Sequence, residues 1–186
     1  MKRLGPWIVL AAALLTMIFF LRWQGRVWTC TCGYVWLWSG NINTADNSQH
    51  FFDPYSFTHV LHGFMFIGIV YLLWPRLNKN WKVVIALSAE ALWEVIENST
   101  YIINRYRSET ISIGYVGDTI LNSFGDILAC ALGVVIARKL GVTKTLVLTA
   151  IIEVALLFFI RDSLLLNIIM LLYPIDAIRD WQSGIP

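Results

Sequence analysis

Apolar runs close to the length that crosses a lipid bilayer are the feature that most constrains this chain. There are five of them, over residues 7–21, 55–74, 82–103, 118–137 and 145–160 approximately. A helix needs about 20 apolar residues to cross the hydrocarbon core, and helices satisfy their own backbone hydrogen bonds there. The sequence therefore predicts an all-α fold, a polytopic membrane helical bundle of about five transmembrane helices. Residues 1–186 are expected to form a single membrane domain.

The composition supports this class and excludes others. Hydrophobic residues make up 58% of the chain and charged residues 14%, whereas soluble chains are about a quarter charged. The net charge of +2 gives no indication of nucleic-acid binding, which usually shows as a strongly basic surface. We expect membrane lipids to be the partners of this chain, with no nucleic acid; the oligomeric state is open.

The segments between the apolar runs suggest how the chain is arranged. Residues 23–54 are polar and rich in tryptophan, which predicts a long connection at the membrane surface. The run over residues 164–173 is too short to span, so it either extends a tilted fifth helix or forms a re-entrant piece. Residues 176–186 read as an amphipathic, interfacial tail. The first run could be a signal peptide, but bulky Phe19 and Phe20 lie where a cleavage site needs small residues, so a retained helix is favoured.

The distribution of Lys and Arg predicts the orientation. If the N-terminus is inside, eight basic residues lie near the inner ends of the spans and six near the outer ends, and every lysine is on the inner side. We therefore expect an N-in/C-out protein of the bacterial inner (plasma) membrane.

The three cysteines are too few for a disulfide framework. For Cys30 and Cys32, which are two residues apart in the outer connection, a redox or metal role and a plain loop role both stay open.

Polar residues enter three of the predicted spans at similar depth. His59 and His62 follow Asp53-Pro54 at the outer start of the second span and share one helix face. At about 1.5 Å of rise per residue, they lie roughly 6 and 10 Å below its outer end. The same estimate places carboxylates of the next two spans, and one amide, in the same outer layer or close to it. These residues are Glu94 and Glu97 in the third span, with Glu90 deeper, and Asp118, Asn122 and Asp126 in the fourth.

Ionisable groups inside a membrane are costly and by default suggest function. They could instead be interhelical hydrogen-bond partners with a purely structural role. The number of such groups on three helices favours a functional pocket that is open to the outer side. A proton or ion path is a further alternative, although no inverted repeat indicates a transporter. There is no phosphate-binding glycine loop and no nucleophile elbow.

A metal site is a more specific hypothesis than a polar pocket in general. His59, His62 and Asp126 are candidate ligands of a divalent metal such as zinc, for which imidazole and carboxylate are suitable. Glu94, Glu97 and Asp118 are candidate catalytic residues that could act as ligand or general base. Asn122, Arg107 and Tyr101 are candidate binding residues, and Arg107 could hold a phosphate or carboxylate through two hydrogen bonds. An equally simple role for Arg107 is interfacial anchoring.

Two resemblances to known families rest on these residues. His62, Glu97 and the pattern Asp118-x-x-x-Asn122-x-x-Gly125 resemble the VanZ-like family of small bacterial membrane proteins, which is named for a teicoplanin-resistance accessory protein. The doubled histidine and Glu97-Asn98 depart from that pattern. Residues 53–59 (DPYSFTH), 93–99 (WEVIENS) and 106–110 (YRSET) are similar to an uncharacterised family of bacterial multi-pass membrane proteins. This similarity extends over most of the chain. It implies a location in the cell envelope and supplies no reaction.

The sequence leads to two functional hypotheses. In the first, the outer-leaflet His/Glu/Asp pocket binds a lipid or lipid-linked head group without catalysis. In the second, the chain is a membrane-embedded, metal-dependent hydrolase or transferase that acts on a lipid. Whether the chain is an enzyme is not decided by the sequence.

Overall fold

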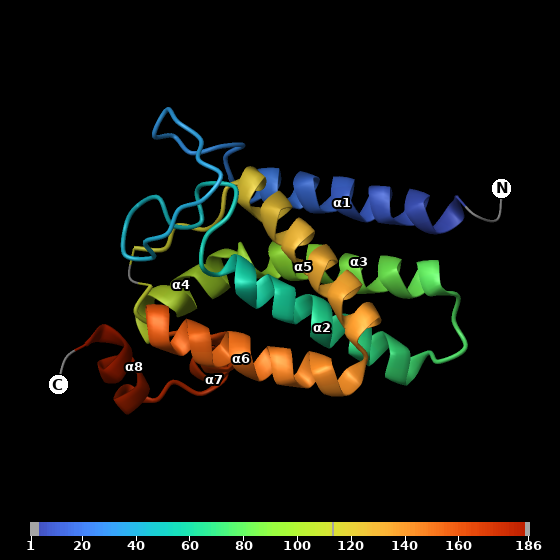
Figure 1. Ribbon diagram of the computed structural model, residues 1–186. Helices are drawn as coiled ribbons and strands as arrows, with labels where there is room; N and C mark the ends of the chain where they lie inside the picture. The colour runs from blue at the N-terminus through green and yellow to red at the C-terminus, as the bar shows by residue number, and fades with distance from the viewer. Residues whose placement is uncertain (1–3, 113, 185–186) are drawn as a thin grey trace.

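The computed structural model describes residues 4–112 and 114–184, and this part of the chain is helical. It contains eight helices: α1 (Gly5–Trp23), α2 (Ser56–Leu73), α3 (Lys79–Glu97), α4 (Thr100–Glu109), α5 (Ile120–Leu140), α6 (Val142–Ile160), α7 (Leu164–Leu172) and α8 (Asp176–Ser183). Within the described residues the only strand-like pairing is one isolated bridge between Trp38 and Phe52. The prediction of an all-α bundle is confirmed (Figure 1).

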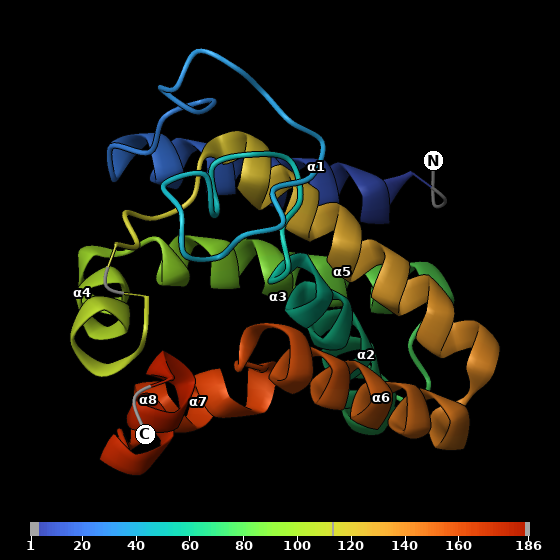
Figure 2. The same ribbon diagram turned by 60° about the vertical axis from the view of Figure 1, so that its left-hand side comes forward.

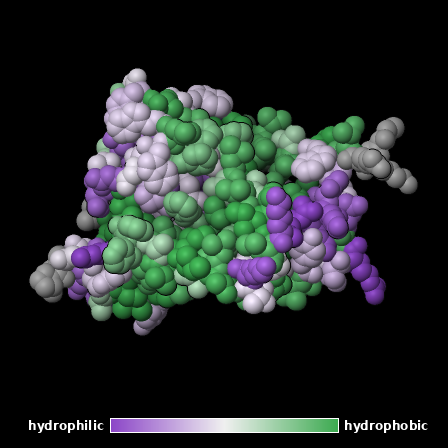
Figure 3. Space-filling view, in the orientation of Figure 1, coloured by the Kyte–Doolittle hydropathy of each residue, from purple (hydrophilic) through white to green (hydrophobic). Residues whose placement is uncertain are grey.

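Among the described residues, four helices are long and apolar enough to cross a membrane, namely α1, α2, α5 and α6. The third predicted span contributes α3, which has 19 residues but carries three glutamates and two lysines. It packs beside α1 and α2 within the bundle (Figure 1). Figure 3 shows hydrophobic residues across the middle of one face and hydrophilic residues gathered toward its two ends. This arrangement suits a bundle that is surrounded by lipid at its centre.

The predicted third span, residues 82–103, is divided in the structure. Helix α3 ends at Glu97 and α4 begins at Thr100. Ser99 causes the break, since its extended backbone and side-chain oxygen form an N-cap that accepts a hydrogen bond from the Ile102 N–H. Helix α4 consequently points in a different direction from α3, as a comparison of Figures 1 and 2 shows.

Helix α2 is central and packs most extensively against α5. The two helices cross at Gly63 and Gly133, where the backbones come into direct contact. A Cβ atom on Gly63 would meet the Cys130 carbonyl oxygen, and the Val134 nitrogen at 2.8 Å. Small residues at a crossing point permit this approach in membrane bundles. The close crossing positions the His59 side of α2 against the Asp126 side of α5.

The connection between α1 and α2 covers one end of the bundle (Figure 1). It is tied to the start of α5 by backbone hydrogen bonds, from Thr119 N to the Ser48 oxygen at 3.1 Å and from Ile120 N to the Val27 oxygen at 2.9 Å. Gly125 of α5 lies against the backbone of Phe51 in this connection. The connection is therefore an ordered cover over the polar end of the bundle.

After α6 the chain forms two short helices, α7 and α8. Arg161 adopts a left-handed conformation (φ 54°) and ends α6, and the Ser163 side chain caps the start of α7. The apolar run near residues 164–173 is thus a separate short helix. Asp162 anchors the turn, since it accepts hydrogen bonds from the Tyr55 hydroxyl at 3.0 Å and from Gln182 Nε2 at 2.9 Å.

Candidate functional site

His59 lies at the centre of a cluster that three helices form. Its Nδ1 is 2.5 Å from Glu90 Oε1 and 3.5 Å from Glu94 Oε1, both on α3. Its Nε2 is 3.9 Å from Asp126 Oδ2 on α5. The imidazole and all three carboxylates are buried. Buried carboxylates repel one another when they are ionised, and the imidazole N–H that faces Glu90 offsets part of this cost.

His62 lies one helical turn further along α2 and shares the same partner. Its Nδ1 is 3.1 Å from Glu90 Oε2, so each carboxylate oxygen of Glu90 faces one imidazole. A carboxylate can only accept hydrogen bonds, hence both rings carry their N–H at Nδ1. This leaves the Nε2 lone pairs of His59 and His62 free. Histidines that bind metals are usually held in this way, with the other ring nitrogen donating to a carboxylate.

Glu94 and Glu97 carry oxygens that have no hydrogen-bond partner in the described residues. Glu94 is fully buried, and neither of its carboxylate oxygens is hydrogen-bonded. Glu97 accepts one hydrogen bond, from the Tyr106 hydroxyl at 3.1 Å, and its Oε2 is left over. Buried polar atoms are nearly always satisfied, so such atoms need an explanation, and an absent ion or ligand is one.

Asp118 is held just ahead of α5 by three hydrogen bonds. Asn98 Nδ2 donates to its Oδ2 at 2.7 Å, the Tyr115 hydroxyl donates to its Oδ1 at 2.9 Å, and its own N–H donates to Asn98 Oδ1. Burial raises the pKa of the Asp118 carboxyl, and the hydrogen bonds from Asn98 and Tyr115 oppose this effect. Asp118 is thus rigidly placed with little freedom to turn toward another partner.

Asp126 and Asn122 project from the next turns of α5. The Ser56 hydroxyl donates to Asp126 Oδ1 at 3.0 Å, while the Asn122 side-chain nitrogen has no partner among the described residues. Asp53, ahead of α2, accepts hydrogen bonds from the Ser48 and Tyr55 backbone N–H groups. Burial raises the pKa of the Asp53 carboxyl.

These groups border a cavity of about 180 Å³. Its polar wall includes four carboxylates, of Asp53, Glu97, Asp118 and Asp126, together with His59 and His62. Its apolar wall consists of Met65, Phe66, Trp93, Leu164, Ile168 and Leu171. None of the described residues that line it is Lys or Arg. The cavity therefore offers negative charge, hydroxyl groups and an apolar side to any molecule that enters.

Comparisons with known proteins identify the family. The model of a family described as "Protein of unknown function (DUF2585)" matches residues 21–184. The chain belongs to the DUF2585 family. A UPF0314 protein of Sinorhizobium fredii is 43% identical over 99% of this chain and 95% of the relative. The corresponding figures are 41%, 99% and 95% for a UPF0314 protein of Paracoccus denitrificans, and 45%, 91% and 88% for one of Novosphingobium aromaticivorans.

These matches confirm the expectation of an uncharacterised bacterial family. No solved structure matches the chain significantly. The resemblance to the VanZ-like family stays a prediction. The DUF2585 match spans both the acidic wall and α7, so the whole pocket falls within the shared region.

The structure brings together most of the residues that the sequence singled out. His59, His62, Glu94, Glu97, Asp118, Asn122 and Asp126 all lie in or directly behind the cavity wall. Two candidate binding residues lie elsewhere. Tyr101 is 75% exposed on α4, and exposed Arg107 donates from Nε to the Tyr115 carbonyl oxygen at 2.6 Å. Neither side chain lines the cavity.

Glu90 lies closer to the histidines than the sequence predicts. The apolar run extends to about residue 103, which predicts a position for Glu90 far below them. Since α3 ends at Glu97, Glu90 lies only about 10 Å from its end, which is the depth of His62. The Asn98-Ser99 pair, with Ser99 as an N-cap, was the signal that could have revealed this.

Two overlapping groups in this cluster could hold a divalent metal. Ligand atoms of His59, His62 and Glu90 lie within 4.8 Å of one another, and so do those of His59, Glu94 and Glu97. The imidazole nitrogens and the unpartnered oxygens of Glu94 and Glu97 suit Zn²⁺ or another divalent ion. The donor set thus fits a metal, and the fit rests on these residues alone.

Proposed function

We propose that the chain binds the polar head of a membrane lipid or of a lipid-linked molecule in this pocket, on the outer side of the bacterial inner membrane. The observation that carries the proposal is the mixed lining, in which carboxylates and imidazoles share one cavity with apolar side chains from α2, α3 and α7. A volume of about 180 Å³ corresponds to about six water molecules at about 30 Å³ each. It accommodates a head group, so the tail would extend along the apolar wall into the bilayer.

The charge of the pocket restricts the head group. Four lining carboxylates and no lining Lys or Arg among the described residues repel a bare phosphate or carboxylate. Amine-bearing or hydroxyl-rich head groups are compatible, because Tyr55, Tyr106 and Tyr115 add hydroxyls and aromatic faces. A phosphate would need a divalent cation to neutralise the carboxylates.

A substitution on the apolar wall tests this proposal. Ile168, which is 39% exposed, lines the cavity, whereas Leu165 on the same helix is 59% exposed and does not. Ile168→Trp fills the pocket and should reduce lipid that co-purifies with the chain by at least about tenfold, while Leu165→Trp should retain it. Native mass spectrometry in nanodiscs that contain phosphatidylethanolamine and phosphatidylglycerol measures both amount and preference. Equal lipid occupancy in the two variants would contradict the proposal.

A second candidate function, metal-dependent hydrolysis or transfer on a lipid, is favoured by the unpartnered carboxylate of Glu94. A divalent metal would supply Lewis-acid activation of the scissile bond. His59 and His62 would hold it through Nε2, with Glu90 fixing both rings, and Glu94 or Glu97 could accept a proton from water.

Elemental analysis of the purified chain separates the two functions. Stoichiometric zinc or manganese that is lost in His59→Ala and His62→Ala, but kept in Glu109→Gln, would support the metal-dependent function. Glu109 is a suitable control because its carboxylate lies on α4, outside the cavity. Metal-free protein that still binds lipid would leave only the binding function.

A further inference from the structure

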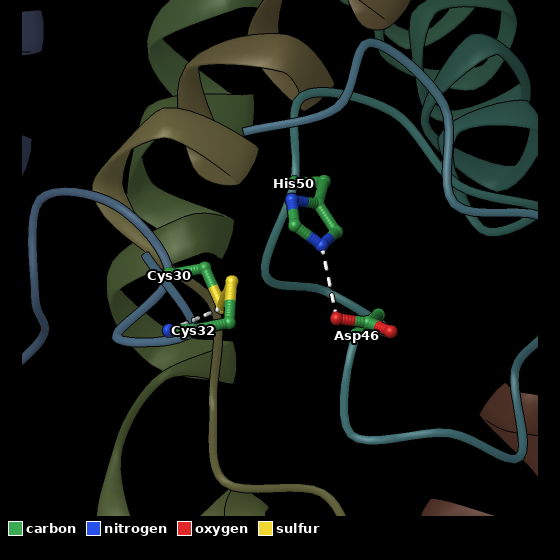
Figure 4. Close-up of side chains that lie close together, drawn as sticks. All are labelled: Cys30, Cys32, Asp46 and His50. Carbon is green, nitrogen blue, oxygen red and sulfur yellow. Dashed lines mark hydrogen bonds and ion pairs between the residues drawn. A yellow bond between two sulfur atoms is a disulfide. The ribbon is translucent and has the colours of Figure 1, made fainter. Parts of the chain in front are cut away.

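A second group of reactive side chains lies outside the pocket, in the connection between α1 and α2. Cys30 and Cys32 form a disulfide there, in which Cys32 is exposed and Cys30 is partly buried. Figure 4 shows the disulfide beside the hydrogen-bonded pair of His50 and Asp46. Sulfur, nitrogen and oxygen atoms of the four residues all lie within 4.8 Å of one another.

The surroundings of His50 determine what this group can do. The ring is buried (1% exposed) and is flanked by Tyr34 and Trp36, with ring centres 5.3 and 5.0 Å away. The Trp36 backbone N–H donates to its Nδ1 at 3.2 Å. The neutral ring therefore carries its hydrogen on Nε2, from which it donates to Asp46 Oδ1 at 3.1 Å.

This tautomer disfavours a metal site. A histidine that binds a metal through Nε2 normally donates a hydrogen bond from Nδ1, but here Nδ1 faces a donor. The Nε2 lone pair is not available as long as that nitrogen holds its hydrogen. His59 and His62 in the pocket show the opposite arrangement, with Nδ1 facing a carboxylate.

Asp46 is kept as an anion beside the disulfide. Its Oδ1 accepts hydrogen bonds from the Tyr34 hydroxyl at 2.8 Å and from His50. The hydrogen bonds from Tyr34 and His50 lower the pKa of the Asp46 carboxyl. A fixed negative charge near a sulfur atom opposes formation of a thiolate there.

The disulfide is poorly suited to a structural role. It joins residues two positions apart, and the stabilisation from a disulfide grows with the length of the loop that it closes. Exposed disulfides are typically the labile or catalytic ones. We propose that Cys30–Cys32 is a redox-active site that undergoes thiol–disulfide exchange with a dithiol molecule or protein, and that Asp46 slows its reduction.

The exchange proceeds in two steps. A thiolate of the dithiol attacks exposed Cys32 Sγ, the Cys30–Cys32 bond breaks, and Cys30 leaves as a thiolate that takes a proton from water. The second thiol of the partner loses its proton and attacks the partner's own sulfur in the mixed disulfide, which releases Cys32, and Cys32 takes up a proton. The dithiol thereby loses two electrons and two protons and becomes a disulfide, and Cys30 and Cys32 become thiols. Because Cys30 departs beside the Asp46 carboxylate, that charge opposes the first step.

The test uses the full chain in nanodiscs with dithiothreitol as the dithiol. After the reaction is quenched with acid, the protein is unfolded and its thiols are counted by maleimide-polyethylene glycol adducts. Cys130 is the remaining cysteine and is free, so the oxidised chain gives one adduct and the reduced chain three. We expect complete reduction of the folded chain, and reoxidation by oxidised dithiothreitol.

Two variants isolate the charge of Asp46. At 4.8 Å or less in a water-like medium, removal of one charge is equivalent to about a fourfold change in rate, so Asp46→Asn should be reduced about four times faster. Tyr34→Phe removes one hydrogen bond but keeps the charge, and should stay within about twofold of the wild type. In denaturant all three chains should react equally.

Three outcomes would overturn the proposal. The disulfide could resist dithiothreitol until the chain unfolds. Asp46→Asn and Tyr34→Phe could accelerate reduction equally, which would indicate general loosening of the connection. The purified chain could instead hold Cys30 and Cys32 as thiols with stoichiometric zinc, in which case the site binds a metal.

Discussion

The crossing of α2 and α5 allows a sharp test of the packing that assembles the pocket. Gly63 and Gly68 are both on α2, but their surroundings differ. A Cβ on Gly63 would lie 2.8 Å from Val134 N and 3.0 Å from Gly133 Cα, besides meeting the Cys130 oxygen, whereas a Cβ on Gly68 would meet nothing within 4 Å. The atoms around Gly63 are backbone atoms, so no side-chain rotation can make room.

The magnitude follows from two opposing effects. In Gly68→Ala, the better helix propensity of alanine leaves the free energy of unfolding unchanged or raises it by up to about 1 kcal/mol. In Gly63→Ala, the same gain is opposed by overpacking that costs about 1–3 kcal/mol or more, and the helices must move apart. Because the gain is common to both variants, we expect them to differ by about 1–3 kcal/mol or more, with Gly63→Ala the less stable.

Thermal unfolding in one detergent measures this difference. At roughly 2–4 °C per kcal/mol for a chain of this size, the melting temperatures should differ by about 2–12 °C. Gly133→Ala should destabilise the chain about as much as Gly63→Ala does. The double variant should lose less stability than the two single variants lose together, because the first substitution already separates the helices. Equal melting temperatures for Gly63→Ala and Gly68→Ala would refute the close crossing.

Three further predictions concern single side chains. Burial raises the pKa of Asp162 from 3.8 to about 6, so between about pH 4 and 6 the folded chain holds a proton that the unfolded chain has released. The free energy of unfolding should therefore fall by up to about 3 kcal/mol as the pH rises through this interval, and Asp162→Asn should remove that part of the pH dependence in melting curves. Asn98→Ala removes two hydrogen bonds to Asp118 and should cost about 2–3 kcal/mol by denaturant titration, whereas exposed Asn104→Ala should change stability by less than about 0.5 kcal/mol. Cys130 is fully buried on α5 and should react with maleimide only after unfolding; labelling of the folded chain would contradict its position.

Hydropathy predicted the helices well because membrane spans are set by length and apolarity, which are local properties. The side chains that form the pocket could also be predicted from the sequence, since residues on one helix face at similar depth converge when the helices pack. His59, Glu94 and Asp126 meet for this reason. Glu90 was misplaced because a single serine N-cap, Ser99, ends α3 earlier than the apolar run does.

Other features depended on tertiary contacts that no local pattern specifies. Whether residues 164–173 continue α6 or turn back depends on the left-handed conformation of Arg161 and on the hydrogen bonds that Asp162 accepts. The apolar wall that Leu164, Ile168 and Leu171 contribute could therefore not be inferred. The same holds for the proximity of Cys30 and Cys32 to His50, because an irregular connection brings these residues together.

The two walls of the pocket come from separate stretches of chain. All of its carboxylates and imidazoles lie between residues 53 and 126, whereas half of its six apolar side chains belong to α7, after residue 163. Substitutions in α7 can reshape the apolar side of the pocket without altering its carboxylates and imidazoles. If the pocket binds a lipid as proposed, members of the family can diverge in the length or branching of the tails they accept while they keep the same polar chemistry.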